Sequence, residues 1–252
     1  IVAHETGHQW WGNIVMPGKG PGGNIISEGL AEFSALMLVH HELGEDQAKT
    51  LRRRWERDYV FGRSPDDERA INRTDGTRPG DQVVTYQRAG LVFWMLRELM
   101  GEEQMLAGLR SFVEKWKNGV ETADGLDFPL IEDMVESLRA HAPDVAVFDA
   151  FVAQWIFGTA LPELELSDVD VADAAGALTT TTELRNIGSG AVDVVVRVMG
   201  ASSEEIEDVV VRVAPNTPAS VVVSTSFTPT KIVVDPEVRV LFAGRKRCEK
   251  SL

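Results

Sequence analysis

Cysteine, tyrosine and long apolar runs are all scarce in this chain. Among its 252 residues there is one cysteine, Cys248, and there are only two tyrosines. A single cysteine excludes an internal disulfide framework and leaves the redox compartment open. No apolar stretch reaches the roughly 20 residues that a membrane-spanning helix needs, and no signal peptide is recognisable.

Basic side chains are also in the minority. The chain has 25 Lys and Arg against 39 Asp and Glu, which gives a net charge of −14. This balance argues against nucleic acid or an anionic membrane surface as a partner. With 44% hydrophobic residues the chain can bury a real core, and its length favours two domains. Because it begins with Ile1 and not with methionine, we expect it to be a piece of a longer protein.

The residues that carry chemistry stand near the start, in the run His4-Glu5-Thr6-Gly7-His8. On a helix, residues four apart share a face, so His4 and His8 can both direct a ring nitrogen at one metal ion. Catalytic zinc usually takes three protein ligands and keeps a fourth position for water. Two histidines and a glutamate form one such set, and Glu28 opens the next apolar, helix-forming segment. The sequence therefore predicts one zinc ion held by His4, His8 and Glu28.

Other candidates for the third ligand are less suitable. The metzincin pattern needs a glycine and a histidine where this chain has Trp11 and Ile14. Cys248 lies in a basic tail at the far end, and we expect His40, His41 and His141 to be solvated near helix ends. The five-residue motif also occurs by chance in helices that bind nothing, but the run Gln9-Trp10-Trp11-Gly12-Asn13 and the distal glutamate argue against that interpretation here.

Three segments resemble the aminopeptidase N family of zinc metallopeptidases, which are gluzincins with a distal glutamate ligand. They are residues 4–13, residues 28–33 and residues 86–90, with the sequence Tyr86-Gln87-Arg88-Ala89-Gly90. The resemblance covers the C-terminal part of a catalytic domain and a following β-sandwich. The ligand spacing is one residue longer than in the best-known members, and the Gly/Pro-rich segment 16–23 absorbs it. The longer spacing and the residues around Glu28 resemble a bacterial branch of the family, in which the peptidase domain is fused to membrane permease segments.

The motif and the resemblance together assign roles to individual residues. Glu5 is placed to act as the general base that takes a proton from a zinc-activated water. The resemblance implies that Tyr86 stabilises the oxyanion of the reaction; the alternative is an ordinary amphipathic tyrosine at a helix start. Glu32, one turn after Glu28, is either a carboxylate that supports a histidine ligand or a solvated glutamate.

The function that the resemblance implies is a zinc-dependent aminopeptidase that hydrolyses the N-terminal peptide bond of a peptide substrate. Three alternatives stay open: a thermolysin-type endopeptidase, a hydrolase acting on a non-peptide substrate such as an epoxide, and a non-catalytic zinc-binding scaffold. The upstream half that grips the substrate's amino group in this family is absent from these residues, so we expect the piece alone to be inactive. The longer parent would be either cytoplasmic or attached to a membrane, and its oligomeric state is open.

The order of elements predicts a multidomain α and β chain. Residues 1–160 should form a mostly helical, thermolysin-like catalytic subdomain, and residues 161–252 a small immunoglobulin-like β-sandwich. Ser27 is expected to cap a helix that ends at Gly44, and Gly101 should end the helix containing Leu91 to Leu99. Further helices are expected over 106–116, 128–138 and 145–157, with a flexible glycine-rich connection at 18–23. Strands are expected over 163–171, 178–186, 191–198, 206–213, 219–224, 231–234 and 238–242, followed by a frayed basic tail at 244–250.

Overall fold

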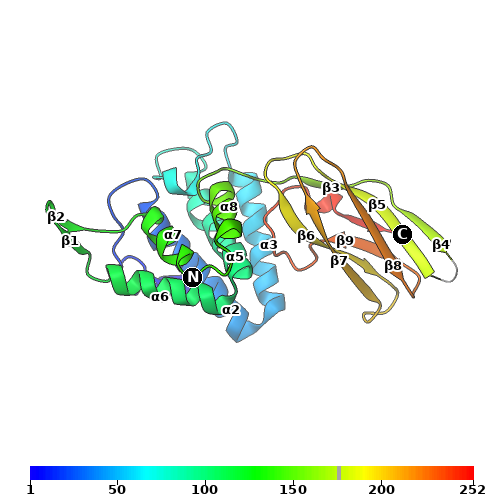
Figure 1. Ribbon diagram of the computed structural model, residues 1–252, viewed down its shortest axis with the longest axis horizontal. Coiled ribbons are helices and arrows are strands. Elements are labelled where there is room, and N and C mark those ends of the chain that lie inside the picture. The colour runs from blue at the N-terminus through cyan, green and yellow to red at the C-terminus, as the bar shows by residue number, and fades with distance from the viewer. Residues whose placement is uncertain (175–176) are drawn as a thin grey trace. The chain divides into compact units, whose positions relative to one another are not determined.

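The computed structural model describes residues 1–174 and 177–252, which divide into two compact units, residues 1–159 and residues 160–252. The first unit, blue to green in Figure 1, is helical apart from one short hairpin. The second, yellow-green to red, is built mainly of antiparallel strands. The chain is therefore a mixed α and β protein, as the sequence predicts. In the part that the structure describes, no helix has both the length and the apolar character needed to cross a membrane.

The first unit contains long helices joined by short turns. Its helices are α1 (Val2–Gly7), α2 (Leu30–Leu43), α3 (Glu45–Gly62), α4 (Asp81–Val83), α5 (Ala89–Met100), α6 (Glu102–Trp116), α7 (Ile131–Arg139) and α8 (Val145–Trp155). Its tighter or wider turns are the π-helical η1 (Ile25–Gly29) and η3 (Val84–Arg88) and the 3₁₀ turn η2 (Ile71–Arg73). The hairpin pairs β1 (Val120–Thr122) with β2 (Gly125–Asp127).

Two glycines separate consecutive helices where the sequence predicts. Gly44 stands between α2 and α3 with φ +85°, and Gly101 stands between α5 and α6 with φ +82°. Other residues rarely adopt positive φ, so glycine lets the chain leave one helix and start the next within a single residue.

The core of this unit lies where α2, α5, α6 and α7 meet. Its fully buried side chains include Phe33 and Leu36 of α2, Phe93 of α5, Phe112 of α6 and Leu138 of α7. The helical period of apolar residues thus predicts most of the contact faces. Leu99 was expected among them, but it is 40% exposed, because it lies on the outer side of the last turn of α5.

Two local expectations for this unit are wrong, and one element was not expected at all. Ser27 does not cap a helix; it lies inside η1, and no side chain caps the start of α2. The glycine-rich segment 18–23 is pinned, since the Gly18 amide donates to the Pro129 carbonyl and the Gly22 amide to that of Thr74. The β1–β2 hairpin was missed, although Asp124-Gly125, with Gly125 at φ +114°, is a turn signal.

The second unit holds two antiparallel sheets. One has the order β10-β9-β6-β7; in the other, β5 pairs with β3 and β4 and also with β8. The strands are β3 (Leu164–Leu166), β4 (Asp170–Ala174), β5 (Ala177–Asn186), β6 (Val192–Met199), β7 (Ile206–Val213), β8 (Ala219–Thr225), β9 (Lys231–Val234) and β10 (Glu249–Ser251). In β6 the buried residues Val192, Val194, Val196 and Val198 alternate with more exposed ones, so this sheet buries one face.

The end of the chain differs most from the expectation. Residues 163–171 form two strands, β3 and β4, and not one. Residues 238–242 form no strand, and the tail that was expected to fray instead passes through the 3₁₀ turn η4 (Arg245–Arg247) into β10, with Cys248 fully buried before it.

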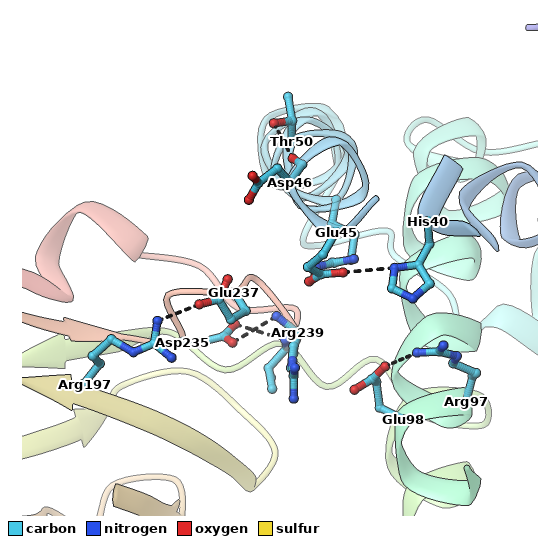
Figure 2. Close-up of polar contacts among 12 residues, drawn as sticks. His40, Glu45, Asp46, Thr50, Arg97, Glu98, Arg197, Asp235, Glu237 and Arg239 are labelled. Atoms are coloured by element: carbon cyan, nitrogen blue, oxygen red, sulfur yellow. Dashed lines mark hydrogen bonds and ion pairs between the residues drawn. The ribbon is translucent and has the colours of Figure 1, made fainter. Parts of the chain in front are cut away.

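A buried carboxylate, that of Asp235, explains why residues 238–242 do not form a strand. Asp235 accepts hydrogen bonds from the backbone amides of Arg239 and Val240, and Arg245 donates to the same carboxylate at 3.2 Å. Those amides are therefore not available to a neighbouring strand. Figure 2 shows the Asp235–Arg239 contact and, beside it, the ion pair of Arg197 with Glu237 at 2.6 Å.

Candidate metal centre

Helix α1 carries both histidines of the motif, and a close helix contact fixes its place. His4 lies in the helix and His8 directly follows its last residue, Gly7. A Cβ added at Gly7 would come within 3.1 Å of the Cα of Ala31 in α2. The backbones of α1 and α2 therefore touch, which brings the histidines near the start of α2, where Glu28 lies.

Three side-chain atoms converge at this point. The Nε2 atoms of His4 and His8 are 3.1 Å apart, and Glu28 Oε2 lies 3.2 Å from the first and 3.4 Å from the second. Ligands around a tetrahedral zinc with bonds of about 2.0 to 2.1 Å are separated by about 3.3 Å. Among the described residues, these three form the one group of histidine, cysteine and carboxylate side chains close enough to share a metal ion. The residues present therefore fit zinc.

The outer nitrogens of the two histidines have different surroundings. His8 Nδ1 donates to the backbone carbonyl of Trp11 at 3.0 Å, which leaves a lone pair on its Nε2, facing Glu28. Two acceptors that face each other need a cation or a proton between them. His4 Nδ1 is buried and has no hydrogen-bond partner in the described part of the chain, and the carboxylate of Glu32 lies 3.8 Å from it.

Glu28 and Tyr86 both occupy π-helical turns. In η1 the amide of Leu30 bonds to the carbonyl of Ile25, five residues earlier, and in η3 the amide of Ala89 bonds to that of Val84. Each turn runs directly into a long helix, α2 or α5. A π-helical turn holds one more residue than an α-helical one and is frequent at functional sites.

A cavity of about 330 Å³ lies beside these residues. It is lined by His4, Glu5, Glu32 and Tyr86, among others. The Tyr86 ring stacks beside that of His4, with centroids 6.0 Å apart and an angle of 26° between the planes. Glu5 is exposed on the cavity side of α1, and Tyr86 and Glu32 are half-buried.

Burial affects the two half-buried acids of the cavity in the same direction. Burial raises the pKa of the Tyr86 phenol, and the negative charge of Glu28 adds to the effect. Burial also raises the pKa of the Glu32 carboxyl, against the opposing positive charge of His4. The Tyr86 hydroxyl thus keeps its proton at neutral pH and can donate it in a hydrogen bond.

The remaining histidines lie outside this centre, but they are not simply solvated. His40 Nδ1 pairs with Glu45 at 3.1 Å, as Figure 2 shows, and its ring packs edge-on against the buried Trp94. His41 pairs with Glu102 at 3.0 Å, and His141 is 2.9 Å from the hydroxyl of Ser111.

Two residues of the centre were not assigned from the sequence. They are Trp11, through its carbonyl, and Asn13, whose side-chain amide donates to the His8 carbonyl at 2.6 Å. A partner of this kind could be expected from the sequence, because a ligating histidine normally donates its second ring N–H to a carbonyl or carboxylate. Which carbonyl it would be depends on how the chain turns after α1, and the sequence does not reveal that.

Comparisons with known proteins agree with this geometry. The model of the peptidase family M1 domain matches residues 1–155. Aminopeptidase N of Haemonchus contortus is 24% identical over 176 residues, which make up 67% of this chain and 18% of that protein. The chain thus spans less than a fifth of the length of this relative. Since the family model covers more than half of the chain, the chain belongs to peptidase family M1, the family of aminopeptidase N.

Proposed function

We propose that this chain carries the zinc-binding half of a metallopeptidase active site, with His4, His8 and Glu28 holding one Zn²⁺. The observation that supports this most is the triangle of ligand atoms, whose edges of 3.1, 3.2 and 3.4 Å match those around tetrahedral zinc. Three protein ligands leave the fourth position open, which is typical of a catalytic site and not of a structural one.

Glu5 and Tyr86 supply the remaining chemistry in this proposal. Bound zinc would act as a Lewis acid and would lower the pKa of a water molecule at its open position. Glu5, on the cavity side of α1, accepts the proton of the attacking water and passes it to the leaving amine. The Tyr86 hydroxyl donates a hydrogen bond to the oxygen that becomes negatively charged.

Glu32 has a supporting role. Its carboxylate lies 3.8 Å from the otherwise unpartnered Nδ1 of His4. A small approach of the Glu32 carboxylate would let it accept a hydrogen bond from Nδ1 of His4. Nε2 of His4 would then be free to bind zinc, as the hydrogen bond to the Trp11 carbonyl leaves Nε2 of His8 free.

We further propose that the substrate is a peptide with a free amino terminus. Support comes from the family and from the relative named aminopeptidase N. Because the chain spans 18% of that relative, other segments would have to bind the amino group. We also propose that residues 1–160 form a thermolysin-like catalytic subdomain and that residues 161–252 form an immunoglobulin-like sandwich that acts as a spacer. Two sheets of antiparallel strands support the second part.

Metal content tests the site directly. Purified wild-type chain should carry about one zinc per chain, and Glu28→Ala should lose it. Glu42→Ala, an exposed glutamate on α2, is the matched control and should keep the metal. A wild-type chain that takes up no zinc after reconstitution would refute the proposed site.

Substrate choice separates the alternatives. A parent protein that cleaves free peptides but not amino-blocked ones is an aminopeptidase, and one that cleaves both is a thermolysin-type endopeptidase. A zinc-loaded protein that cleaves neither is a non-catalytic scaffold or a hydrolase of a non-peptide substrate, and an assay with an epoxide substrate separates these two. Glu5 and Tyr86 line one cavity with the proposed ligand His4, which argues against the scaffold, because a structural zinc site needs neither residue.

A further inference from the structure

Residue 29 is a glycine, although its backbone conformation does not require one. It connects η1 to α2 and has φ −63° and ψ −41°, an ordinary helical conformation that any residue can adopt. Alanine is the better helix former, and glycine weakens a helix. The backbone conformation therefore does not require glycine here, and the reason must lie in the surroundings.

The surroundings of Gly29 are the second π-helical turn. A Cβ added at Gly29 would come within 2.9 Å of the Cβ of Ala89 and within 3.3 Å of the carbonyl oxygen of Thr85. Thr85 lies in η3, and Ala89 is the residue that closes it. The backbone of Gly29 in η1 thus packs against the methyl group of Ala89 and the carbonyl of Thr85, and there is no room between them for a side chain at residue 29.

Both functional side chains are adjacent to this contact. Glu28 immediately precedes Gly29, and Tyr86 immediately follows Thr85. The separation of η1 from η3 at Gly29 therefore sets the distance between the metal ligand Glu28 and the hydroxyl of Tyr86. A methyl group there would have to open the contact by about 1 Å, because carbon atoms pack best at about 3.5 to 4.0 Å.

We propose that Gly29 is a positioning residue, which holds Tyr86 at the correct distance from the metal centre through the contact with Thr85 and Ala89. This rests on the proposed function for its chemical consequence, but the geometric claim can be tested without metal. In a form of the protein that hydrolyses peptides, Gly29→Ala should lower kcat by about 10²-fold, the effect of a 1 Å misplacement, with KM little changed.

The chain offers a sharp rescue variant. Ala89 also has a helical conformation, φ −61° and ψ −47°, so it accepts glycine. The double variant Gly29→Ala with Ala89→Gly moves the methyl group from one backbone to the other and removes the shortest contact. Cγ2 of Ile25, at 3.0 Å, is present in both variants and does not distinguish them. Gly20→Ala is the control, since its nearest neighbour, a methyl of Leu130, would be at 3.5 Å.

NMR of the tyrosine rings measures the position of Tyr86 relative to the metal centre, and the signals are easily assigned because the chain has only two tyrosines. With labelled tyrosine rings and Co²⁺ added, the Tyr86 signals should show a paramagnetic shift in the wild type and in Gly20→Ala. The shift should decrease in Gly29→Ala at unchanged cobalt content and return in the double variant. Tyr59 reports whether the fold is intact. In the metal-free chain, the cross-relaxation between the rings of Tyr86 and His4, 6.0 Å apart, should weaken and recover in the same order.

Each outcome has a definite meaning. An unchanged Tyr86 shift and an unchanged cross-relaxation in Gly29→Ala would overturn the positioning role. So would a double variant that does not fold or stays at the value of the single variant. A wild-type chain that takes up no Co²⁺ would count against the proposed metal site alone, and the metal-free measurement would still decide the role of Gly29.

Discussion

At the scale of single residues, hydrogen bonds on the side of His8 that faces away from Glu28 organise the proposed metal centre. The Trp11 carbonyl fixes the tautomer of His8, and the side-chain amide of Asn13 donates to the His8 carbonyl, so hydrogen bonds hold both the ring and the backbone of this residue. Such contacts restrict ring orientation before any metal binds, which lowers the entropic cost of assembling the site. His4 is less restricted, since its Nδ1 has only the more distant Glu32 beside it.

Tyr86→Phe separates catalysis from metal binding. The substitution removes one hydroxyl donor and leaves all three ligands in place, so zinc content should stay that of the wild type. Loss of a single oxyanion donor typically lowers kcat by about 10² to 10³-fold. Metal analysis and peptide hydrolysis on the longest active form of the protein would measure both. A parallel loss of zinc would mean that Tyr86 is structural.

Tyr59 gives a prediction about pH. Its fully buried hydroxyl donates to Glu68 at 2.6 Å and accepts from Arg88 at 2.9 Å, and burial raises its pKa to about 12. An unfolded tyrosine titrates near pH 10. The folded chain therefore holds a proton that the unfolded chain releases, so this contribution to stability is complete below about pH 10 and is lost as the pH rises towards about 12.

Tyr59→Phe should remove that contribution. At neutral pH the free energy of unfolding should fall by about 1 to 3 kcal/mol, because Glu68 and Arg88 lose a buried partner. The difference from the wild type should shrink between about pH 10 and pH 12. Urea titrations at several pH values would measure it. A difference that stays constant over this range would show that the buried phenol does not titrate as proposed.

At the scale of elements, the two π-helical turns decide how the site is presented. The distance from the histidines points to Glu28 as the third ligand, and the resemblance points to Tyr86, but neither pattern predicts a π-helical turn. Both turns run directly into long, largely apolar helices, α2 and α5, and nothing in the apolar pattern of those helices marks the extra residue. Ser27 illustrates the error. Serine is a residue type that often caps a helix, yet Ser27 lies inside η1, which starts at Ile25 and runs into α2.

Helix α8 depends on a cap that does form. Asp144 accepts hydrogen bonds from the amides of Ala146 and Val147 at 2.9 and 3.1 Å. The helix buries Trp155, whose carbonyl accepts from the buried Arg88. Asp144→Ala should lower the free energy of unfolding by about 1 kcal/mol. Denaturant titration beside Glu103→Ala, an exposed control in α6, would measure this; equal effects of the two would contradict the capping role.

At the scale of the whole molecule, the sequence predicts best what depends on composition and period. The helical patterns give way to alternating β patterns near residue 161, and the structure separates into two compact units after Thr159. The end of the chain was predicted poorly, because long-range contacts override local signals there. Glu249–Ser251 reads as a charged tail, yet it pairs with β9, and Val238 takes φ +53° although β-branched residues disfavour it. The turn around Val238 is held by Asp235, whose carboxylate accepts hydrogen bonds from the amides of Arg239 and Val240, and no local sequence pattern reveals these bonds.

Zinc should stabilise one unit of the chain and not the other. A ligand that binds only the folded state at 100 times its Kd adds about 2.7 kcal/mol to the free energy of unfolding. All three proposed ligands lie in residues 1–159, so hydrogen exchange should slow in peptides from α1, η1 and α2 when zinc is added. Peptides from β6 and β7 should exchange at unchanged rates. Glu28→Gln, which keeps the size of the side chain but weakens the ligand, should abolish the protection. Protection spread evenly over both units, or protection that survives in Glu28→Gln, would mean that the metal binds elsewhere.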